Sequence, residues 1–341
     1  MFFKEEKLMI PEAKQAAVAR ALHEAFSVEK YDDIRPLTAG MSSAMVFRIV
    51  VRGNPYLLRL IMPGALGDPT SEFACMQAAA EAGVAPRVRC ANTADRLLIT
   101  DFVEAKPFPD DLPMRIAPVL HRLHSLPQFP KPRVVKSYFD AIDRFIRRFQ
   151  ASKILPESQT EALFRSYAEL AKIYPQNEAE LVASHNDLKP QNILFDGAHV
   201  WLVDWEAAFL NDRYLDLAVI ANFFVQNEAQ EQEYLRAYFG EPASDYRLAR
   251  FCLMRQTCSI AYATCFLSLA AAAGQSIAPE DPASDFDEFH RRIISGEVDL
   301  MNAHAKAQYG MVHLARALEN MQTARLAEAM ALVANSPAPA N

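Results

Sequence analysis

The sequence predicts an α+β protein with two lobes: a small antiparallel sheet plus one helix, followed by a large, mainly helical lobe. Up to about residue 104, short runs of aliphatic and β-branched residues alternate with turn residues. After Pro113, apolar residues recur at helical spacing almost without interruption. The length of 341 residues also suits two domains. We therefore expect a first lobe at residues 1–104 and a second at residues 105–341.

In the first lobe, a helix from Glu12 to Phe26 precedes the sheet. Four strands are expected where runs of strand-forming residues are bounded by Gly, Pro or Asn; they are Ile34–Thr38, Met45–Val51, Tyr56–Ile61 and Arg96–Phe102. A helix from Thr70 to Ala82 lies between the third and fourth strands and ends before Gly83, a common terminator. The stretch Glu104–Pro113, with three prolines, predicts a connector between the lobes.

The second lobe is predicted from its apolar periodicity to hold eight helices. They are Arg115–Ser125, Ser137–Ala151, Glu157–Tyr174, Asp216–Phe224, Glu228–Phe239, Asp245–Ala273, Asp285–Ile294 and His304–Ala334. One stretch, Leu181 to Trp205, interrupts them with the pattern of strand, loop, strand, turn and strand.

Composition excludes several classes of protein. Lys plus Arg number 35 against 42 Asp plus Glu, so the net charge of −7 argues against a nucleic-acid partner. The five cysteines form no CxxC pair, which favours free thiols in a reducing compartment. No apolar run reaches the ~20 residues that a membrane span needs. We expect a soluble, cytoplasmic protein without a membrane partner, and the sequence leaves its oligomeric state open.

The interruption carries the candidate chemistry. Asp196–Gly197 is a strong hairpin turn between two apolar runs, so Asn192 before the hairpin and Asp204 after it are expected at the same open end. Asp187 begins the preceding loop, which brings two carboxylates and one amide together. A Mg²⁺ ion takes such oxygen ligands and shares them with phosphates. A carboxylate held near the metal can accept a hydroxyl proton.

The order of residues, His185-Asn186-Asp187-Leu188-Lys189-Pro190-Gln191-Asn192, then a hairpin, then Asp204-Trp205-Glu206, resembles the catalytic and metal-binding loops of the protein-kinase-like superfamily. The resemblance implies a two-lobed protein-kinase-like fold. The chain runs from Asp204 through Asn211, Arg213 and Asp216 directly into a helix, which leaves no room for a peptide platform. This segment resembles the aminoglycoside phosphotransferase and choline/ethanolamine kinase family. One departure is Gln226, where choline kinases have a carboxylate.

The resemblance implies ATP and Mg²⁺ as cofactors and assigns roles to individual residues. Asp187 would accept the proton, Lys189 would lie near the transferred phosphoryl group, and His185 would brace the loop by hydrogen bonds. Asn192 and Asp204 would hold the metal ion.

The first lobe would bind the nucleotide. Its phosphates would meet a loop containing Gly40, Ser42 and Ser43, and Arg59 would offset their charge. Glu72 on the following helix is the expected partner of Arg59, and a purely structural Arg59–Glu72 pair is the alternative. Backbone groups of the hinge would hold adenine, at Asp101 and Val103.

The acceptor would be a small molecule with a hydroxyl group and a positive charge. Glu206, Asp212 and Gln226 are the polar candidates for its site. Tyr262 and Phe266, at i and i+4 of one helix, are either core residues or the wall of a cation pocket. The pair His121 and His124 lacks a third metal ligand, and Asp216 is placed to cap its helix or anchor the catalytic loop.

The function expected from this resemblance is transfer of the ATP γ-phosphoryl group to an amino alcohol of the choline or ethanolamine type. One alternative is a kinase for an aminoglycoside or another hydroxyl compound, such as a sugar, an amino acid or thiamine. A second alternative is a nucleotide-binding pseudokinase that serves as an interaction module.

Overall fold

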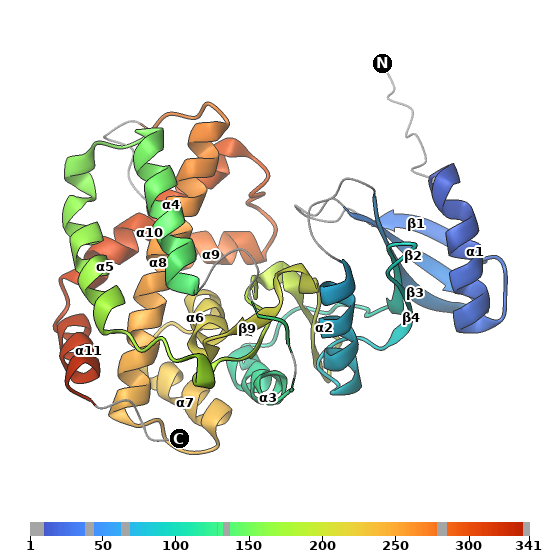
Figure 1. Cartoon of the computed structure of the whole chain (residues 1–341), viewed down its shortest axis with the longest axis horizontal. Helices are drawn as coiled ribbons and strands as arrows, with labels where there is room; N and C mark the ends of the chain where they lie inside the picture. Colours follow the sequence, from blue (N-terminus) through green and yellow to red (C-terminus); the bar gives the residue numbers. More distant parts are fainter. Residues whose placement is uncertain are drawn as a thin grey trace. The chain divides into compact units, whose positions relative to one another are not determined.

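The computed structural model describes residues 10–37, 44–62, 69–127, 129–131, 137–277 and 285–336. By their contacts the residues divide into two compact units (Figure 1). The first unit holds Met1–Phe108 and Ile193–Ala208, and the second holds Pro109–Asn192 and Phe209–Asn341. The sequence analysis expected the boundary between the lobes at residues 104 and 105. The contacts place this boundary after Phe108 and assign Ile193–Ala208 to the first unit as well.

The first unit is built on a five-stranded antiparallel sheet with the order β1-β2-β3-β5-β4. The strands are β1 (Asp33–Leu37), β2 (Ala44–Val51), β3 (Asn54–Ile61), β4 (Val88–Asn92) and β5 (Leu97–Asp101). Strand β4 is absent from the sequence prediction. It is a short edge strand with polar residues and a bulge between Val88 and Cys90, which obscure the two-residue alternation.

Helices α1 (Glu12–Phe26) and α2 (Pro69–Glu81) complete this unit. The apolar face of α1, including Val18 and Leu22, forms one core with Leu58 and Leu60 of β3. Because side chains alternate along a strand, Arg59 points to the opposite face, where it meets Glu72 of α2. The alternation of side chains along β3 therefore places the buried Arg59 guanidinium against α2.

The predicted hairpin is present, with β7 (Ile193–Phe195) paired to β8 (Val200–Leu202). Gly197 supplies the positive φ of +100° at the turn, next to the Lys106 side chain. Backbone hydrogen bonds from Leu202 to Val84 and from Lys106 to Phe195 attach the hairpin to the first unit. A short 3-10 turn, η4 (Trp205–Ala207), follows.

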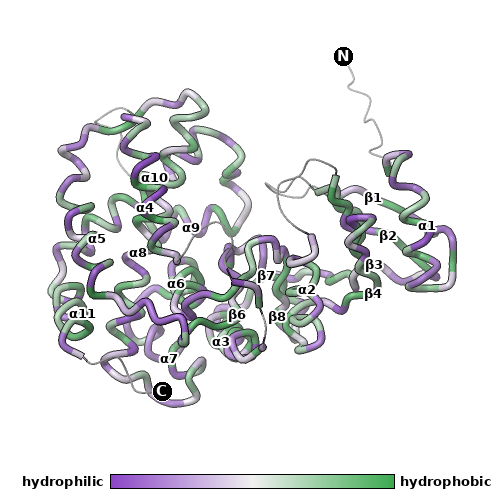
Figure 2. Tube along the Cα trace, in the orientation of Figure 1, coloured by the Kyte–Doolittle hydropathy of each residue, from purple (hydrophilic) through white to green (hydrophobic). Residues whose placement is uncertain are grey.

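The second unit is mainly helical (Figure 1). Its α-helices are α3 (Leu112–His124), α4 (Tyr138–Ser152), α5 (Glu161–Ile173), α6 (Arg213–Phe224), α7 (Glu228–Phe239), α8 (Asp245–Ala272), α9 (Phe286–Ile294), α10 (Ala303–Met321) and α11 (Ala324–Asn335). Short 3-10 turns lie at η1 (Glu157–Gln159), η2 (Glu178–Glu180) and η3 (Pro190–Asn192). Along the helices, hydrophobic and hydrophilic stretches alternate, as expected of helices with one buried face (Figure 2).

This unit differs from the prediction in several places, including the start of the helix predicted at Glu157–Tyr174, where a separate 3-10 turn precedes α5. The single helix expected over His304–Ala334 is wrong, because the chain turns at Gln322 and Thr323 and starts a new helix there. The Thr323 side chain accepts a hydrogen bond from the Leu326 N–H, which is the geometry of an N-cap. The strand β9 (Phe209–Asn211) was not predicted either, and it pairs with β6 (Val182–Ser184).

Helix α8 forms the centre of the second unit and packs closely against α10. At Gly310 of α10, an added Cβ would lie 2.6 Å from the Leu267 side chain and 3.0 Å from its backbone nitrogen. A glycine is therefore required where these two helices meet. All five cysteines are free thiols, as expected. Within the described residues, none of the helices combines the length and apolar character needed to cross a bilayer.

Candidate active site

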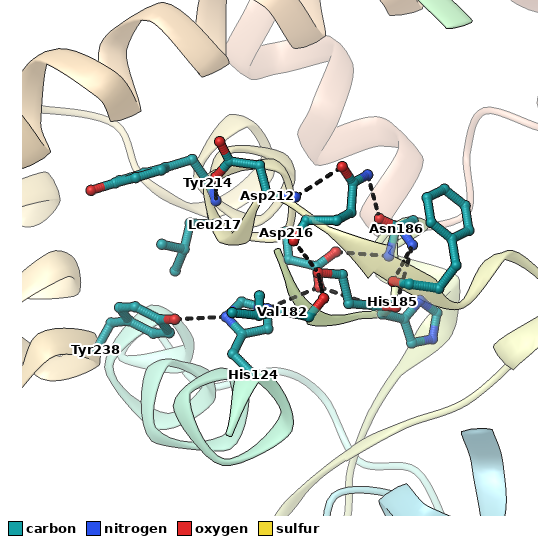
Figure 3. A network of polar contacts seen from close by, with 12 residues as sticks. His124, Val182, His185, Asn186, Asp212, Tyr214, Asp216, Leu217 and Tyr238 are labelled. Carbon is teal, nitrogen blue, oxygen red and sulfur yellow. Dashed lines mark hydrogen bonds and ion pairs between the residues drawn. The ribbon is translucent and has the colours of Figure 1, made fainter. Parts of the chain in front are cut away.

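A buried carboxylate, Asp216, anchors the loop that contains Asp187 (Figure 3). Its two oxygens accept the backbone N–H groups of His185, at 2.9 Å, and Asn186, at 2.8 Å. His124 Nε2 lies 3.1 Å from the same carboxylate, and His124 Nδ1 lies 2.7 Å from the Tyr238 hydroxyl. Burial alone raises the pKa of Asp216, but these hydrogen bonds and the nearby imidazoles lower it below its usual value. The anchor is therefore an ionised carboxylate inside the protein.

Asn186 adopts a left-handed backbone conformation, with φ of 67°. Non-glycine residues reach this region at some cost, and asparagine reaches it more easily than most. Asn211 Nδ2 donates to Asn186 Oδ1 at 2.8 Å. Asn186 Nδ2 in turn donates to the Phe209 carbonyl at 3.3 Å. Strand β9 thus fixes the turn from which the next residue, Asp187, projects.

The Asp187 carboxylate is held through one oxygen. Lys189 Nζ donates to Oδ2 at 2.7 Å, and Asn192 Nδ2 donates to Oδ2 at 2.9 Å and to the Asp187 carbonyl at 2.8 Å. Within the described residues, Oδ1 has no hydrogen-bond partner, and the side chain is 29% exposed. Asp187 is therefore oriented by two donors and keeps one oxygen for a molecule from solvent.

Only the oxygen of the Asn192 side-chain amide could bind a metal ion. Its amide nitrogen makes both hydrogen bonds to Asp187, so its amide oxygen is the atom that could coordinate a cation. No cluster of three or more His, Cys, Asp or Glu residues that could hold a metal occurs in the described part of the chain. A metal here would need further oxygens from a bound substrate, which is the usual situation for Mg²⁺.

In the first unit, Asp204 follows the hairpin in a left-handed conformation, with φ of 67°. Its Oδ1 lies 3.0 Å from Arg59 Nη1, which also lies 3.0 Å from Glu72 Oε1. The Arg59–Glu72 ion pair expected from the sequence is thus present. Arg59 Nη2 lies 3.5 Å from Glu206 Oε2. Asp187 and Asn192 belong to the second unit, so the cation site expected for them with Asp204 is taken up below as a proposal.

Among the residues that the structure describes, one guanidinium group in this cluster faces three carboxylates, so these ion pairs hold more negative than positive charge. Burial raises the pKa of Glu72, while the charge of Arg59 opposes that shift. Glu206 was expected at the acceptor site; its side chain is 51% exposed and it contributes to the ion-pair cluster. The excess negative charge beside Asp204 is a feature that a divalent cation would offset.

Of the other residues predicted to bind nucleotide, Gly40, Ser42 and Ser43 lie outside the described residues. The Asp101 backbone N–H donates to the Arg87 carbonyl at 2.9 Å, and its carboxylate pairs with Arg89 at 2.6 Å. Val103 is half-buried, two residues beyond the end of β5.

Asp212, predicted for the acceptor site, already has several partners in the structure. Its Oδ1 caps α6 by accepting the Tyr214 N–H, and its Oδ2 accepts from the Tyr174 hydroxyl and from Arg250, both within 2.9 Å. Its charge is therefore largely neutralised. Gln226 lies just beyond α6, where it is exposed and its backbone N–H donates to Gln230.

Asp212 also lines a cavity of about 500 Å³ in the second unit. The cavity lies beside the ends of α4 and α5 and against β9; its wall includes Tyr138, Asp143, Tyr174, Asn211 and Arg250. Asn211, which lines this cavity, also holds the Asn186 side chain in the loop that contains Asp187.

Tyr262 and Phe266 belong to an aromatic cluster in the second unit. The two rings are stacked, 6.0 Å apart, and both are half-buried. We define the aromatic cluster as this pair together with the rings packed around it, which are Phe223, Phe286, Phe289, His290, Tyr309 and His313. Burial and, to a smaller degree, the charge of Asp187 raise the pKa of both Tyr262 and Tyr309. The cluster is therefore within electrostatic reach of the Asp187 carboxylate.

Sequence reasoning considered His124 only as a possible metal ligand and did not single out Tyr238 or Tyr309. His124 lies on α3, far from the loop in sequence, and no local pattern links it to Asp216. The amphipathic spacing of α3 marks position 124 as buried, and a buried histidine requires polar partners. That requirement is the one signal that could have pointed to a carboxylate.

Comparisons with known proteins identify the family of this chain. The model of the phosphotransferase enzyme family matches residues 33–252, which is most of the chain. The chain therefore belongs to the phosphotransferase enzyme family. It is a small-molecule phosphotransferase with a kinase-like fold, as the sequence analysis expected.

Among curated proteins, the chain is similar to protein LicA of Haemophilus influenzae, with 26% identity over 117 residues. The match covers 34% of this chain and 36% of that relative, so it spans about a third of each protein.

The solved structures share the fold at low sequence identity. A choline/ethanolamine kinase family protein from Mesorhizobium loti has a TM-score of 0.68 at 22% identity, with 95% of this chain and 100% of that chain covered. Choline kinase LicA from Streptococcus pneumoniae has a TM-score of 0.56 at 15% identity, covering 84% and 98%. Spectinomycin phosphotransferase, solved with ADP and spectinomycin, has a TM-score of 0.53 at 14% identity, covering 86% and 98%.

Proposed function

We propose that this protein is an ATP-dependent kinase that transfers the γ-phosphoryl group to the hydroxyl of an amino alcohol of the choline or ethanolamine type. The observation that carries the proposal is the arrangement at Asp187, where Lys189 and Asn192 hold Oδ2 and leave Oδ1 available. An oriented, partly exposed carboxylate of this kind can align a hydroxyl group and accept its proton. The family match supports phosphoryl transfer as the reaction.

The nucleotide is proposed to be ATP bound with Mg²⁺. Solved relatives hold AMP or ADP, which supports an adenine nucleotide. The Asn192 amide oxygen and the Asp204 carboxylate would hold the ion, which would bridge the phosphates and neutralise charge there. The excess of carboxylates around Arg59 fits a cation at Asp204. Arg59 would then turn toward the phosphates, while Glu72 keeps it in place.

Positioning accounts for most of the proposed catalysis, since phosphoryl transfer passes through a loose transition state. Asp216 fixes the loop through the backbone of His185 and Asn186. His185 itself is fully buried, so it acts on the position of Asp187 and not on the substrate. Lys189, which contacts Asp187 here, would also stabilise charge on the transferred group.

The acceptor is proposed to be cationic because an aromatic cluster lies within electrostatic reach of Asp187. The faces of aromatic rings such as Tyr262 and Phe266 attract organic cations. The solved relatives described as choline kinase and as a choline/ethanolamine kinase family protein support this class of acceptor. An aminoglycoside or another hydroxyl compound is the second candidate, supported by the similarity to spectinomycin phosphotransferase.

The experiment is a measurement of ADP release by the purified protein with MgATP and a panel of acceptors. The panel contains choline, ethanolamine, spectinomycin, an aminoglycoside, a simple sugar, serine and thiamine. We expect turnover with an amino alcohol at least about tenfold above the rate without acceptor. Turnover only with the antibiotics, sugar, serine or thiamine would show that the acceptor is not an amino alcohol. Nucleotide binding without turnover on any acceptor would favour a nucleotide-binding interaction module.

A further inference from the structure

Arg250, on α8, is a buried arginine that pairs with two carboxylates at once. The residue is 5% exposed, and its guanidinium group lies over the rings of Tyr174 and Tyr214, 5.3 Å and 4.9 Å from their centroids. Nη1 lies 2.5 Å from Glu180 Oε2, and Nη2 lies 2.8 Å from Asp212 Oδ2. Buried charges in proteins are paired, and here one rigid, planar group holds both carboxylates.

The two carboxylates flank the pair of strands beside the loop that contains Asp187. Glu180 ends η2, just before β6, and Asp212 directly follows β9. The two strands pair antiparallel, so Arg250 joins the start of β6 to the end of β9. The loop begins where β6 ends. Arg250 therefore holds together the two strands from which this loop emerges.

A chain of hydrogen bonds connects Asp212 to the residue before Asp187 (Figure 3). The Asp212 backbone N–H donates to Asn211 Oδ1 at 2.9 Å, and Asn211 Nδ2 donates to Asn186 Oδ1 at 2.8 Å. Asn186 has the left-handed backbone from which Asp187 projects. Because the Asn211 amide is held at both of its polar atoms, a shift of Asp212 would move Asn186 as well.

Asp212 also fixes the start of α6. Its Oδ1 accepts the Tyr214 N–H at 2.9 Å, as the N-cap of this helix. Asp216, in the first turn of α6, accepts two backbone N–H groups of the loop. The ion pair with Arg250 therefore supports both contacts that hold the loop, one through the Asn186 side chain and one through the loop backbone.

We propose that Arg250 is a positioning residue for phosphoryl transfer, which acts through Asp212 and the loop to place the Asp187 carboxylate. This inference rests on the proposed function, in which Asp187 accepts the proton of the acceptor hydroxyl. Phosphoryl transfer depends on alignment, and a misplacement of about 1 Å can lower a rate about 100-fold. Lysine keeps the charge but lacks the planar fork that reaches two carboxylates, so it is no substitute for arginine here.

The test compares kcat and KM of the wild type, Arg250→Lys and Arg247→Lys, with MgATP and the best acceptor of the wild type. For Arg250→Lys we expect kcat to fall about 10–100-fold while KM for MgATP changes less than about threefold, because the loop moves and the nucleotide contacts stay. Arg247 is the matched control on the same helix; it pairs with Glu241 at 2.8 Å and covers the Phe239 ring. Its partners are not part of the hydrogen-bond chain to the loop, so Arg247→Lys should keep the kcat of the wild type.

Chemical rescue separates positioning from a general loss of stability. Arg250 and Asp212 line the cavity of about 500 Å³, whose wall also includes exposed residues such as Lys172, so a small cation can reach the place of a truncated side chain. Guanidinium at millimolar concentration, too dilute to unfold most proteins, should raise the kcat of Arg250→Ala at least about tenfold. An equal concentration of sodium chloride should not.

Tyr174→Phe tests the same position without touching the buried charge. It removes one hydrogen bond to Asp212 Oδ2 and leaves the ion pair with Arg250. We expect kcat to fall about two- to tenfold with KM for MgATP unchanged, since one hydrogen bond contributes less than the ion pair. This variant decides the question if neither Arg250 variant folds.

Several outcomes would overturn the inference. If the wild type is active and Arg250→Lys or a folded Tyr174→Phe keeps its kcat, Arg250 has a structural role only, and the proposed function stands. The inference also fails if Arg247→Lys loses as much kcat as Arg250→Lys, or if guanidinium does not raise the kcat of folded Arg250→Ala. If the wild type phosphorylates no acceptor, the inference and the proposed function both fail.

Discussion

Asp216 holds the loop that contains Asp187, because its carboxylate accepts hydrogen bonds from two backbone N–H groups and contacts His124. In Asp216→Asn the side chain keeps its size, but one oxygen becomes an NH₂ group that faces a donor. We expect the free energy of unfolding to fall by about 1–3 kcal/mol, because a buried donor loses its acceptor. We also expect kcat to fall while the affinity for nucleotide changes little.

Urea unfolding and steady-state kinetics measure the two effects. The matched control is Asp285→Asn at the exposed N-cap of α9, where asparagine caps a helix equally well. An Asp216→Asn variant as stable and as active as the wild type would show that this carboxylate is not needed to hold the loop.

The buried histidines predict a loss of stability in mild acid. Burial lowers the pKa of His290 to about 4 and that of His313 well below its usual value, while in the unfolded chain both titrate near 6.5. Between pH 6.5 and about 4 the unfolded chain therefore binds more protons than the folded protein. His290 should therefore reduce the free energy of unfolding by about 1.4 kcal/mol for each pH unit by which the pH falls over that range, and His313 changes it in the same direction.

The measurement is the slope of unfolding free energy against pH for the wild type and for His290→Phe. The variant lacks one titrating group, so its slope should be shallower by about one histidine's contribution. Equal slopes would show that His290 titrates alike in the folded and unfolded states.

At the residue level, the sequence identified the side chains of the loop but not what holds them. Asp187, Asn192 and Asp204 were predicted from the motif and the hairpin, and the Arg59–Glu72 pair from the cost of an isolated arginine in an apolar strand. His124 could not be assigned to Asp216, because that contact joins helices 92 residues apart. Asp212 was assigned to the acceptor because it is acidic, whereas Arg250 and Tyr174 use its charge within the protein. Local sequence patterns indicate which interactions a residue can form, but they do not identify its partner in the folded protein.

At the level of the elements, the close contact of α8 and α10 depends on Gly310. Gly310→Ala would place a methyl group 3.0 Å from the Leu267 backbone nitrogen, which cannot move aside as a side chain could. We expect a loss of about 1–3 kcal/mol in the free energy of unfolding, although alanine has the higher helix propensity. Gln308→Ala on the same helix serves as the control and should stay within about 0.5 kcal/mol.

Thermal or urea unfolding measures both variants. A Gly310→Ala protein that is more stable than the wild type would show that propensity outweighs the contact between the helices.

Periodicity was sufficient for most elements and failed where tertiary contacts decide. The helix Glu228–Phe239 was predicted with its observed bounds, since Asn227 caps it and Gly240 ends it. The break at Thr323 lies within a continuous apolar pattern, and only the cap geometry reveals it. The strands β4 and β9 are short, and each is defined by the strand beside it. Such elements carry little information in their own sequence.

At the scale of the whole molecule, the proposal assigns the metal–nucleotide complex to residues from both units. Asn192 of the second unit and Asp204 of the first would both contribute oxygens. MgADP at 100 times its dissociation constant should stabilise the wild type by about 2.7 kcal/mol. We expect Asn192→Ala and Asp204→Ala each to lose most of that stabilisation.

A thermal shift with and without MgADP measures this effect for each variant. Asp285→Asn again serves as the control, and its shift should equal that of the wild type. A full shift in Asp204→Ala would place the nucleotide complex elsewhere.

The most direct test of the central claim is single-turnover phosphoryl transfer by Asp187→Asn, with the best acceptor of the wild type. Asparagine keeps the size of the side chain but cannot accept the hydroxyl proton. We predict a rate about 100–10,000-fold below that of the wild type, with an unchanged stabilisation by MgADP. A rate close to that of the wild type would contradict the assignment of Asp187 as the base.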